Sequence, residues 1–354
     1  MKKVKKINIK SLTFLLSIFF VANANGYSDT TSASEKNNYQ PYIQLGGTGF
    51  FHIQESNAAA IADLFVPLWQ KDFSNLVFTD IRINDRSGTP FEGTVHLGYR
   101  HLFSDEQQMF GVYGAWDRKK TLYDSYFNQI TVGAEYWNQS WFVGGNVYKP
   151  IGDTSKLLNQ QITSVPVPPF DNQQITVDKL HEKAMPGADA EVGYEFIEGL
   201  VGYVGGYYFG ASGVDTICGP RARLTYDWSL DDGRILGIFD KVGLEAGVQR
   251  DTPRGITGYL SANVRVGWLF DKKSELRGLS RHMIDPVRRD IDVISQEESS
   301  PEQEAIDLSN YTVCSAKGDS DKCYRKITNR YPISPDKVES LHQYVDKRIT
   351  GNAK

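Results

Sequence analysis

The stretch YFNQITVGAEYW, residues Tyr126 to Trp137, alternates apolar and polar side chains. Its two series are Ile130, Val132, Ala134 and Tyr136 on one side, and Gln129, Thr131, Gly133 and Glu135 on the other. A period of two is typical of a β-strand whose two faces meet different surroundings. A tilted strand needs about 9–11 residues to cross a bilayer. The stretch therefore predicts a strand long enough to span a membrane.

The same pattern recurs between Tyr42 and Phe270, in segments of about 10–13 residues bounded by turn residues. The segments begin near Tyr42, Ala58, Phe73, Phe91, Gln108, Ser125, Ser140, Ala184, Leu200, Ile217, Phe239 and Thr257. A soluble sandwich alternates in the same way, so the composition of the polar side decides between the two folds. That side carries Gly, small residues, carboxylates and Arg with almost no Lys, which suits a crowded, hydrated lumen with paired charges. We therefore predict an all-β fold, a 12-stranded antiparallel transmembrane β-barrel.

The composition supports a barrel and argues against other classes of protein. Lys and Arg number 39 against 43 Asp and Glu, so the net charge is −4 and the surplus of cations that a nucleic-acid partner needs is missing. Mean hydropathy is −0.40. After the first few dozen residues, no apolar run approaches the roughly 18 residues of a membrane helix. The 32 Gly and 12% aromatic residues suit strands that are apolar on only one side.

Tryptophans and turn lengths orient the predicted barrel. All six Trp lie near predicted strand ends, where their rings would form girdles at the headgroup level: Trp69, Trp116, Trp137, Trp141, Trp228 and Trp268. Short turns such as Asn138–Ser140 alternate with longer connections, above all Gly152–Lys183. In such barrels short turns are periplasmic and long loops external. We expect Gly152–Lys183, which contains several prolines, to be an irregular external loop.

The amino terminus predicts export. Five Lys between Lys2 and Lys10 precede an apolar stretch from Leu12 to Val21, and Ala22-Asn23-Ala24 is a small-x-small cleavage site. Residues 1–24 are therefore predicted to be a signal peptide, since the apolar stretch is too short for an anchor helix. Residues 25–40 are polar and are predicted to be a periplasmic lead-in to the barrel at 41–270.

The segment after the barrel, 271–298, is predicted to occupy the pore. Barrels of about eight strands are filled by side chains and those of about sixteen are open, so twelve strands leave room for about one polypeptide segment. Ser274 can cap a helix that runs to Met283 and that Pro286 ends or kinks. We expect arginines of this linker to pair with carboxylates of the lumen: Arg277, Arg281, Arg288 and Arg289 with Glu135, Glu191, Glu195 and Glu245. Composition alone also allows a solvated linker.

Six blocks of the chain resemble a known family. They are ADLFVPLW (62–69), EGTVHLGYRHLF (92–103), YFNQITVGAEYW (126–137), GNVYKPIGD (145–153), HEKAMPGADAEVGYEF (181–196) and HMIDPVRRDIDVI (282–294). In this order and spacing they look like the β-domain of inverse autotransporters, the intimin/invasin family, over roughly Pro41 to Ser295. The resemblance implies an outer-membrane barrel of a Gram-negative bacterium whose linker re-enters the pore and delivers a passenger to the surface by type V secretion. It makes Ser274–Met283 the linker helix and Val287–Ile294 the extended part that leaves the pore.

The tail, 299–354, is predicted to be a small element that contains α-helix. Ser295–Gln303 is acidic and is expected to be disordered. Cys314 and Cys323 in an exported chain predict a disulfide bond. Ser334-Pro335 predicts the start of a helix with one apolar face. Such an element suits a miniature passenger, and the sequence leaves open whether it is exposed on the surface or lies in the periplasm.

No catalytic chemistry is expected. The six His are scattered, and His181 with Glu182, Asp171 and Asp178 forms the only candidate cluster for an enzyme active at the rim of the barrel. Carboxylates in external loops are ordinarily solvated. We predict no catalytic residues, no cofactor, no metal site and no nucleic-acid partner.

The predicted function is an outer-membrane anchor that exports and displays its own tail, in the manner of adhesins and invasins. The expected partners are outer-membrane lipid, periplasmic chaperones and the barrel-assembly machinery, for which Trp268 and Phe270 would form the carboxy-terminal signal of the barrel. A surface ligand is not identified by the sequence. The alternative is a porin-like or structural barrel whose tail stays in the periplasm.

Overall fold

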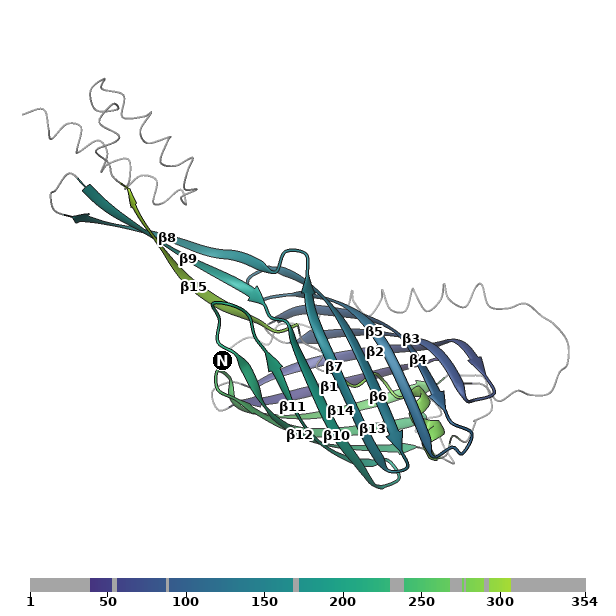
Figure 1. Ribbon diagram of the computed structural model, residues 1–354. Helices are drawn as coiled ribbons and strands as arrows, with labels where there is room; N and C mark the ends of the chain where they lie inside the picture. The colour runs from purple at the N-terminus through teal and green to yellow at the C-terminus, as the bar shows by residue number, and fades with distance from the viewer. Residues whose placement is uncertain are drawn as a thin grey trace, which may run out of the picture.

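The computed structural model describes residues 39–52, 56–86, 89–167, 172–229, 239–267, 276, 278–289 and 293–306. In this part of the chain, twelve antiparallel strands close into a barrel (Figure 1). The barrel strands are β1 (Tyr42–His52), β2 (Ser56–Lys71), β3 (Asn75–Arg86), β4 (Thr89–Leu102), β5 (Gln108–Lys120), β6 (Tyr126–Asn138), β7 (Trp141–Ile151), β10 (Gly187–Ile197), β11 (Leu200–Phe209), β12 (Ile217–Ser229), β13 (Lys241–Asp251) and β14 (Gly255–Gly267). Each predicted segment corresponds to one of these strands, with starts that differ by at most three residues. The predicted 12-stranded barrel is confirmed.

Alternation of side chains explains why these segments form a closed wall. Along β6, Thr131 is fully buried toward the lumen, while its neighbour Val132 is 63% exposed on the outer surface. A strand with two such different faces can satisfy both only when one faces the interior and the other faces lipid. Closure pairs β1 with both β2 and β14, so the barrel has no open edge strand.

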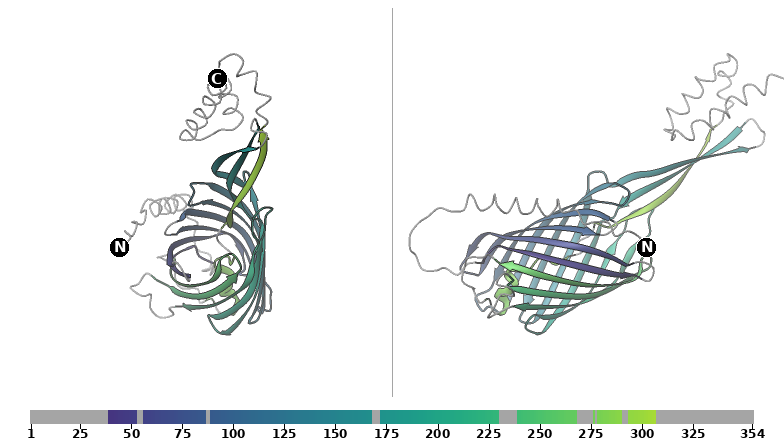
Figure 2. Two further views of the ribbon diagram at one scale, coloured as in Figure 1. Left: turned by 90° about the vertical axis from the view of Figure 1, so that its left-hand side faces the viewer. Right: turned by 180° about the vertical axis from the view of Figure 1, so that it is seen from behind.

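One insertion distinguishes the two ends of the barrel, since short connections occur at both ends and the connection from Ser229 to Lys241 is long. Turns 72–74, 103–107, 139–140 and 198–199 gather at one end, called here the short-turn end. The hairpin of β8 (Ser155–Val167) and β9 (Asn172–Ala184) projects from the other, called the long-loop end (Figures 1 and 2). Because this hairpin is inserted between β7 and β10, these two strands pair directly in the wall.

The hairpin corrects two expectations drawn from the sequence. Gly152–Lys183 is not an irregular loop, because most of it forms β8 and β9. Ser295–Gln303 is not disordered, because it belongs to β15 (Ser295–Ile306), which pairs with β9 in a separate sheet of order β15-β9-β8. The physical reasons differ. β8 and β9 pair with each other as a local hairpin, although their sequences show no strong alternation. β15 is stabilised by β9, more than a hundred residues away in sequence, which local patterns do not reveal.

The linker helix lies inside the barrel near the short-turn end. Of the helix expected over Ser274–Met283, the structure describes Leu276, which is not helical, and residues 278–283, which belong to a short 3₁₀ helix, η1 (Gly278–Ile284). Figure 2 shows it within the ring of strands. Pro286 follows two residues later, at a position where a helix cannot continue. Among the described residues, no helix has the length and apolar character needed to cross a membrane.

Several predicted features lie outside the described residues. They are the signal peptide, most of the lead-in at 25–40, Trp268 and Phe270, the linker residue Arg277, and the tail from residue 307 onward with Cys314 and Cys323.

Candidate functional site

The candidate site is the contact between the linker and the inner wall of the barrel. At the short-turn end this contact is apolar. The linker contributes Leu279, Met283, Ile284 and Val287, all buried. The wall contributes inward-facing residues that include Tyr42, Phe65, Leu76, Phe78, Leu102, Met109, Trp137, Phe142, Val201 and Tyr203. The expectation of a polar, hydrated lumen is therefore wrong at this end, because the apolar side chains of the linker are removed from water here.

Trp137 belongs to this apolar cluster and not to a membrane girdle. Its ring stacks on the imidazole of His282, with centroids 4.0 Å apart and planes 11° from parallel, and only 3% of Trp137 is exposed. It follows Tyr136 on β6, so the alternation of the strand turns it inward. Four of the other predicted girdle residues are exposed on the outer surface: Trp69, Trp116, Trp141 and Trp228.

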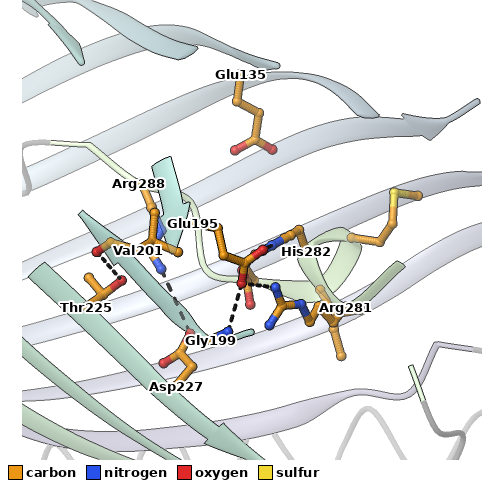
Figure 3. Close-up of polar contacts among 12 residues, drawn as sticks. Glu135, Glu195, Gly199, Val201, Thr225, Asp227, Arg281, His282 and Arg288 are labelled. Carbon is orange, nitrogen blue, oxygen red and sulfur yellow. Dashed lines mark hydrogen bonds and ion pairs between the residues drawn. The ribbon is translucent and has the colours of Figure 1, made fainter. Parts of the chain in front are cut away.

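Arg281 forms an ion pair with Glu195, near the turn between β10 and β11 (Figure 3). The same carboxylate accepts a hydrogen bond of 2.8 Å from the backbone N–H of Gly199. Gly199 has a φ of 86°, and a Cβ at this position would collide with the carbonyl of Asp227. Glycine is therefore required at the turn that holds Glu195 in place.

Asp285 is the centre of a second charged group. It lies 2.6 Å from His282 Nδ1 and 3.1 Å from Lys241 Nζ, and Lys241 also lies 2.9 Å from Asp227. Arg288 reaches the same part of the wall, 4.0 Å from Asp227 and 3.9 Å from Glu245. The linker thus contributes charges of both signs, and each meets an opposite charge on the wall.

Arg100 holds the backbone of the linker. Its guanidinium lies 2.5 Å from Glu135 and donates hydrogen bonds to the carbonyls of Met283, at 2.9 Å, and Asp285, at 2.6 Å. Only 1% of Arg100 is exposed. Glu135 therefore pairs with an arginine of the wall and not with one of the linker, and acts on the linker through Arg100.

Other contacts of the wall also differ from the predicted pairs between linker arginines and lumen carboxylates. Glu191 forms ion pairs with Arg221, at 3.8 Å, and with Arg223, both on β12. The Tyr42 hydroxyl donates to the carbonyl of Ile284 at 2.7 Å. The Tyr113 hydroxyl lies 3.2 Å from the carbonyl of Arg288. Backbone carbonyls of the linker are thus held by donors from several strands.

Arg289 and Asp117 form an ion pair with both side chains fully buried. Asp117 also accepts hydrogen bonds from the hydroxyls of Thr94, at 2.7 Å, and Thr131, at 3.1 Å. Arg289 Nε lies 2.9 Å from His96 Nε2, so that nitrogen must act as an acceptor. The sequence analysis missed Asp117; its place on the polar side of β5 was visible, but its partner was not.

At the long-loop end the linker leaves the barrel between Glu92 and Lys119. The backbone N–H of Val293 donates to Glu92 at 3.0 Å, and Lys119 Nζ donates to the carbonyl of Val293 at 2.9 Å. The carbonyl of Ile294 then accepts from the N–H of Met185 at 2.8 Å. From this point the chain continues as β15, outside the barrel.

The linker does not fill the lumen completely. A cavity of about 340 Å³ lies beside it, lined mainly by β1, β12, β13 and β14 and by the linker from Pro286 to Arg289. Its walls carry Arg221, Arg223, Glu191 and Glu245. Residues 286–289 of the linker therefore face a polar cavity inside the lumen.

The candidate enzyme cluster is described only in part. Glu182 is buried and accepts hydrogen bonds from the hydroxyls of Thr121, at 2.7 Å, and Ser295, at 2.8 Å. Asp171 and the side chain of Asp178 lie outside the described residues. Glu182 therefore anchors the first residue of β15.

These features define a class: a transmembrane β-barrel of the outer-membrane type whose lumen contains its own linker. Residues 50–196 match the family model described as inverse autotransporter, beta-domain. Over these residues the match confirms the resemblance predicted from the sequence. Family and fold together indicate the outer membrane of a Gram-negative bacterium.

Solved structures agree on the fold. A chain from a study of the mechanism of in-meso crystallization of membrane proteins has a TM-score of 0.53 and 15% identity, covering 73% of this chain and 100% of that chain. Outer membrane phospholipase A from Escherichia coli scores 0.37 at 11% identity, over 71% of this chain and 98% of that one. The COG4313 outer membrane channel from Pseudomonas putida F1 scores 0.40 at 10% identity, over 68% and 100%. At these scores the last two carry no argument about function. No curated protein matches the sequence.

Proposed function

We propose that this protein is an outer-membrane anchor that exports and displays its own carboxy-terminal tail, as an inverse autotransporter of the intimin/invasin type. The observation that carries the proposal is the path of the linker. It enters near the short-turn end at Leu279, passes Arg289 in the middle of the lumen, and leaves at Ile294 beside the base of β9. A tail that remained on the side of the short turns would have no reason to follow this path.

The contacts along the path support a mechanism with two stages. An unfolded segment first passes through the lumen, which has room for about one chain. The linker then stops where its apolar residues meet the aromatic cluster and where Arg289 meets Asp117. Apolar burial at the short-turn end excludes water from the lumen, so the same residues that stop the linker also seal the pore.

Orientation follows from the rule that short turns face the periplasm and long loops face the outside. The tail from 299 to 354, with its expected Cys314–Cys323 disulfide, is then a small passenger at the cell surface. Residues 1–24 act as the signal peptide, and Trp268 and Phe270 form the signal read by the barrel-assembly machinery. We assign the barrel no catalytic role and no cofactor, and its surface ligand is unidentified.

Protease treatment of intact cells tests the proposal. A peptide tag after Lys354 should be cleaved by protease added outside the cells, whereas the same tag inserted in the lead-in at residue 32 should be protected. Protection of both tags would favour the alternative, a porin-like or structural barrel with a periplasmic tail. Lysed cells serve as the control that both tags can be cleaved.

A further inference from the structure

The β8–β9 hairpin is completed by the segment that leaves the pore. In the sheet of order β15-β9-β8, β9 has β8 on one side and β15 on the other (Figure 1). Before β15 arrives, one edge of β9 is therefore without a neighbouring strand. An open strand edge is a template for pairing with another extended segment.

Pairing begins where the wall contacts end. The carbonyl of Ile294 accepts from the N–H of Met185 at 2.8 Å, and the next residue, Ser295, lies opposite Ala184. The register then runs without a shift to Ile306 opposite Gln173. The edge of β9 is thus continuous with the exit of the lumen, and an emerging chain meets it first.

The sequence of β15 does not favour a strand by itself. The segment SQEESSPEQEAI contains four Glu, three Ser and one Pro, residue types that are depleted in strands. A polar segment of this kind stays unstructured when alone, which suits passage through a narrow lumen. Its strand conformation is therefore imposed by β9.

The single proline of β15 occupies a position that the ladder tolerates. Met185 and Ile294 form a hydrogen-bonded pair, so residues 296, 298, 300 and 302 direct their backbone groups toward β9 by alternation. Pro301 falls between them, at a position whose backbone nitrogen faces the outer edge of the sheet. Proline is accepted in edge strands at this kind of position.

Charge complementarity adds to the pairing near the exit. Lys183 Nζ on β9 lies 2.5 Å from Glu298, and the Tyr123 hydroxyl, from the turn between β5 and β6, contacts Glu297. The acidic segment thus meets a cation and a hydroxyl as soon as it leaves the barrel.

We infer that the edge of β9 is a docking site that captures residues Ser295–Ile306 as they emerge, and that this pairing draws export forward. The inference rests on the proposed function. Every second residue that joins the ladder exchanges solvated backbone groups for paired ones and cannot slide back without breaking those hydrogen bonds. The ladder therefore gives direction to a passage that the lumen alone leaves reversible.

Two adjacent serines provide a matched test. Ser300→Pro removes a backbone N–H that points toward β9, whereas Ser299→Pro removes one that points to the outer edge. The full chain, tagged after Lys354, is pulse-labelled in cells, and the time at which the tag becomes accessible to external protease is measured. Ser300→Pro should lengthen the half-time about fivefold, the effect of losing one ladder hydrogen bond, and Ser299→Pro should match the wild type.

The outcomes separate the inference from the proposed function. Equal half-times for Ser300→Pro and the wild type, with the tag exposed in both, would overturn capture by β9 and leave display intact. A tag that is protected in the wild type would overturn the proposed function itself. Heat-modifiable migration of each variant on gels verifies that the barrel has folded, so a slow variant is not mistaken for a misfolded one.

Discussion

The two ends of the lumen hold the same linker by different interactions. At the short-turn end, Met283 and Val287 pack among aromatic residues of the wall. Toward the long-loop end, Arg289 is paired with Asp117, and the backbone of Val293 is held by Glu92 and Lys119. Apolar burial is non-directional, whereas a buried ion pair requires one specific geometry. We infer that the first end closes the pore and the second specifies where the linker stops.

Removal of the linker abolishes both kinds of contact and has the largest expected effect. Deletion of residues 274–294 should change the purified barrel from a closed pore to an open one, because no other segment that the structure describes crosses the lumen. Single-channel conductance in planar bilayers measures the change. A deletion of equal length from the tail, 307–327, should leave conductance as in the wild type. An unchanged conductance after the first deletion would mean that the linker does not close the pore.

Breaking the buried ion pair of Arg289 and Asp117 tests whether contacts toward the long-loop end position the linker. Asp117→Ala should lower the free energy of unfolding by about 3–5 kcal/mol, because the Arg289 guanidinium stays buried without the Asp117 carboxylate. Urea denaturation in detergent micelles, followed by tryptophan fluorescence, measures the loss. Adding Arg289→Met should restore much of it, since a buried pair replaced by apolar groups is often close to neutral. A loss below about 1 kcal/mol for Asp117→Ala would remove the pair as the element that positions the linker.

Truncation of a side chain in the apolar cluster tests whether the short-turn end closes the pore. Met283→Ala should lower the free energy of unfolding by about 2–4 kcal/mol through lost burial and a cavity. It should also raise the ion leak through the barrel, which Asp117→Ala should affect less. Leu122→Ala serves as the control, because Leu122 is 64% exposed in a turn at the long-loop end. If Met283→Ala and Asp117→Ala raise the ion leak equally, the proposed difference in role between the two ends is wrong.

The ion pair near the mouth should contribute least. Arg281 and Glu195 are 18% and 11% exposed, whereas Arg289 and Asp117 are fully buried, so Glu195→Gln should cost less than Asp117→Ala, about 1–2 kcal/mol. The difference from the wild type should shrink in 1 M salt, where the Debye length is about 3 Å. Urea midpoints at low and high salt measure this. If the loss in free energy of unfolding is the same at both salt concentrations, the Arg281–Glu195 pair is shielded from solvent like the Arg289–Asp117 pair.

The sequence predicted the wall of the barrel better than its contents. Alternation in segments such as Tyr126–Trp137 located every barrel strand, because each strand faces two different surroundings and shows both in its own residues. The linker and the arginines 281, 288 and 289 were also placed in the lumen. Their partners were harder to predict: Arg289 meets Asp117 across 172 residues, and Arg100 meets the carbonyl of Met283 across 183.

The prediction for the lumen was partly wrong because it assigned the same polar character to both ends. The polar character of the inner faces suggested one hydrated lumen, yet the inward-facing Phe65, Phe78 and Trp137 collect at a single end. Each of them sits in a strand that also carries polar inward residues, such as Asp63, Asp80 and Gln129, so no segment showed the cluster by itself. Only closure of the barrel brings inward residues of distant strands to the same height.

The sequence by itself determined the number of barrel strands and, to within three residues, where each begins, since these depend on short-range alternation and on turn residues. Tertiary structure decided which wall residues meet the linker, which end of the lumen is apolar, and that Ser295–Ile306 becomes a strand on β9. The reason is that pairing between distant segments depends on where closure of the barrel places them. The residues next to a segment in the sequence do not determine that placement.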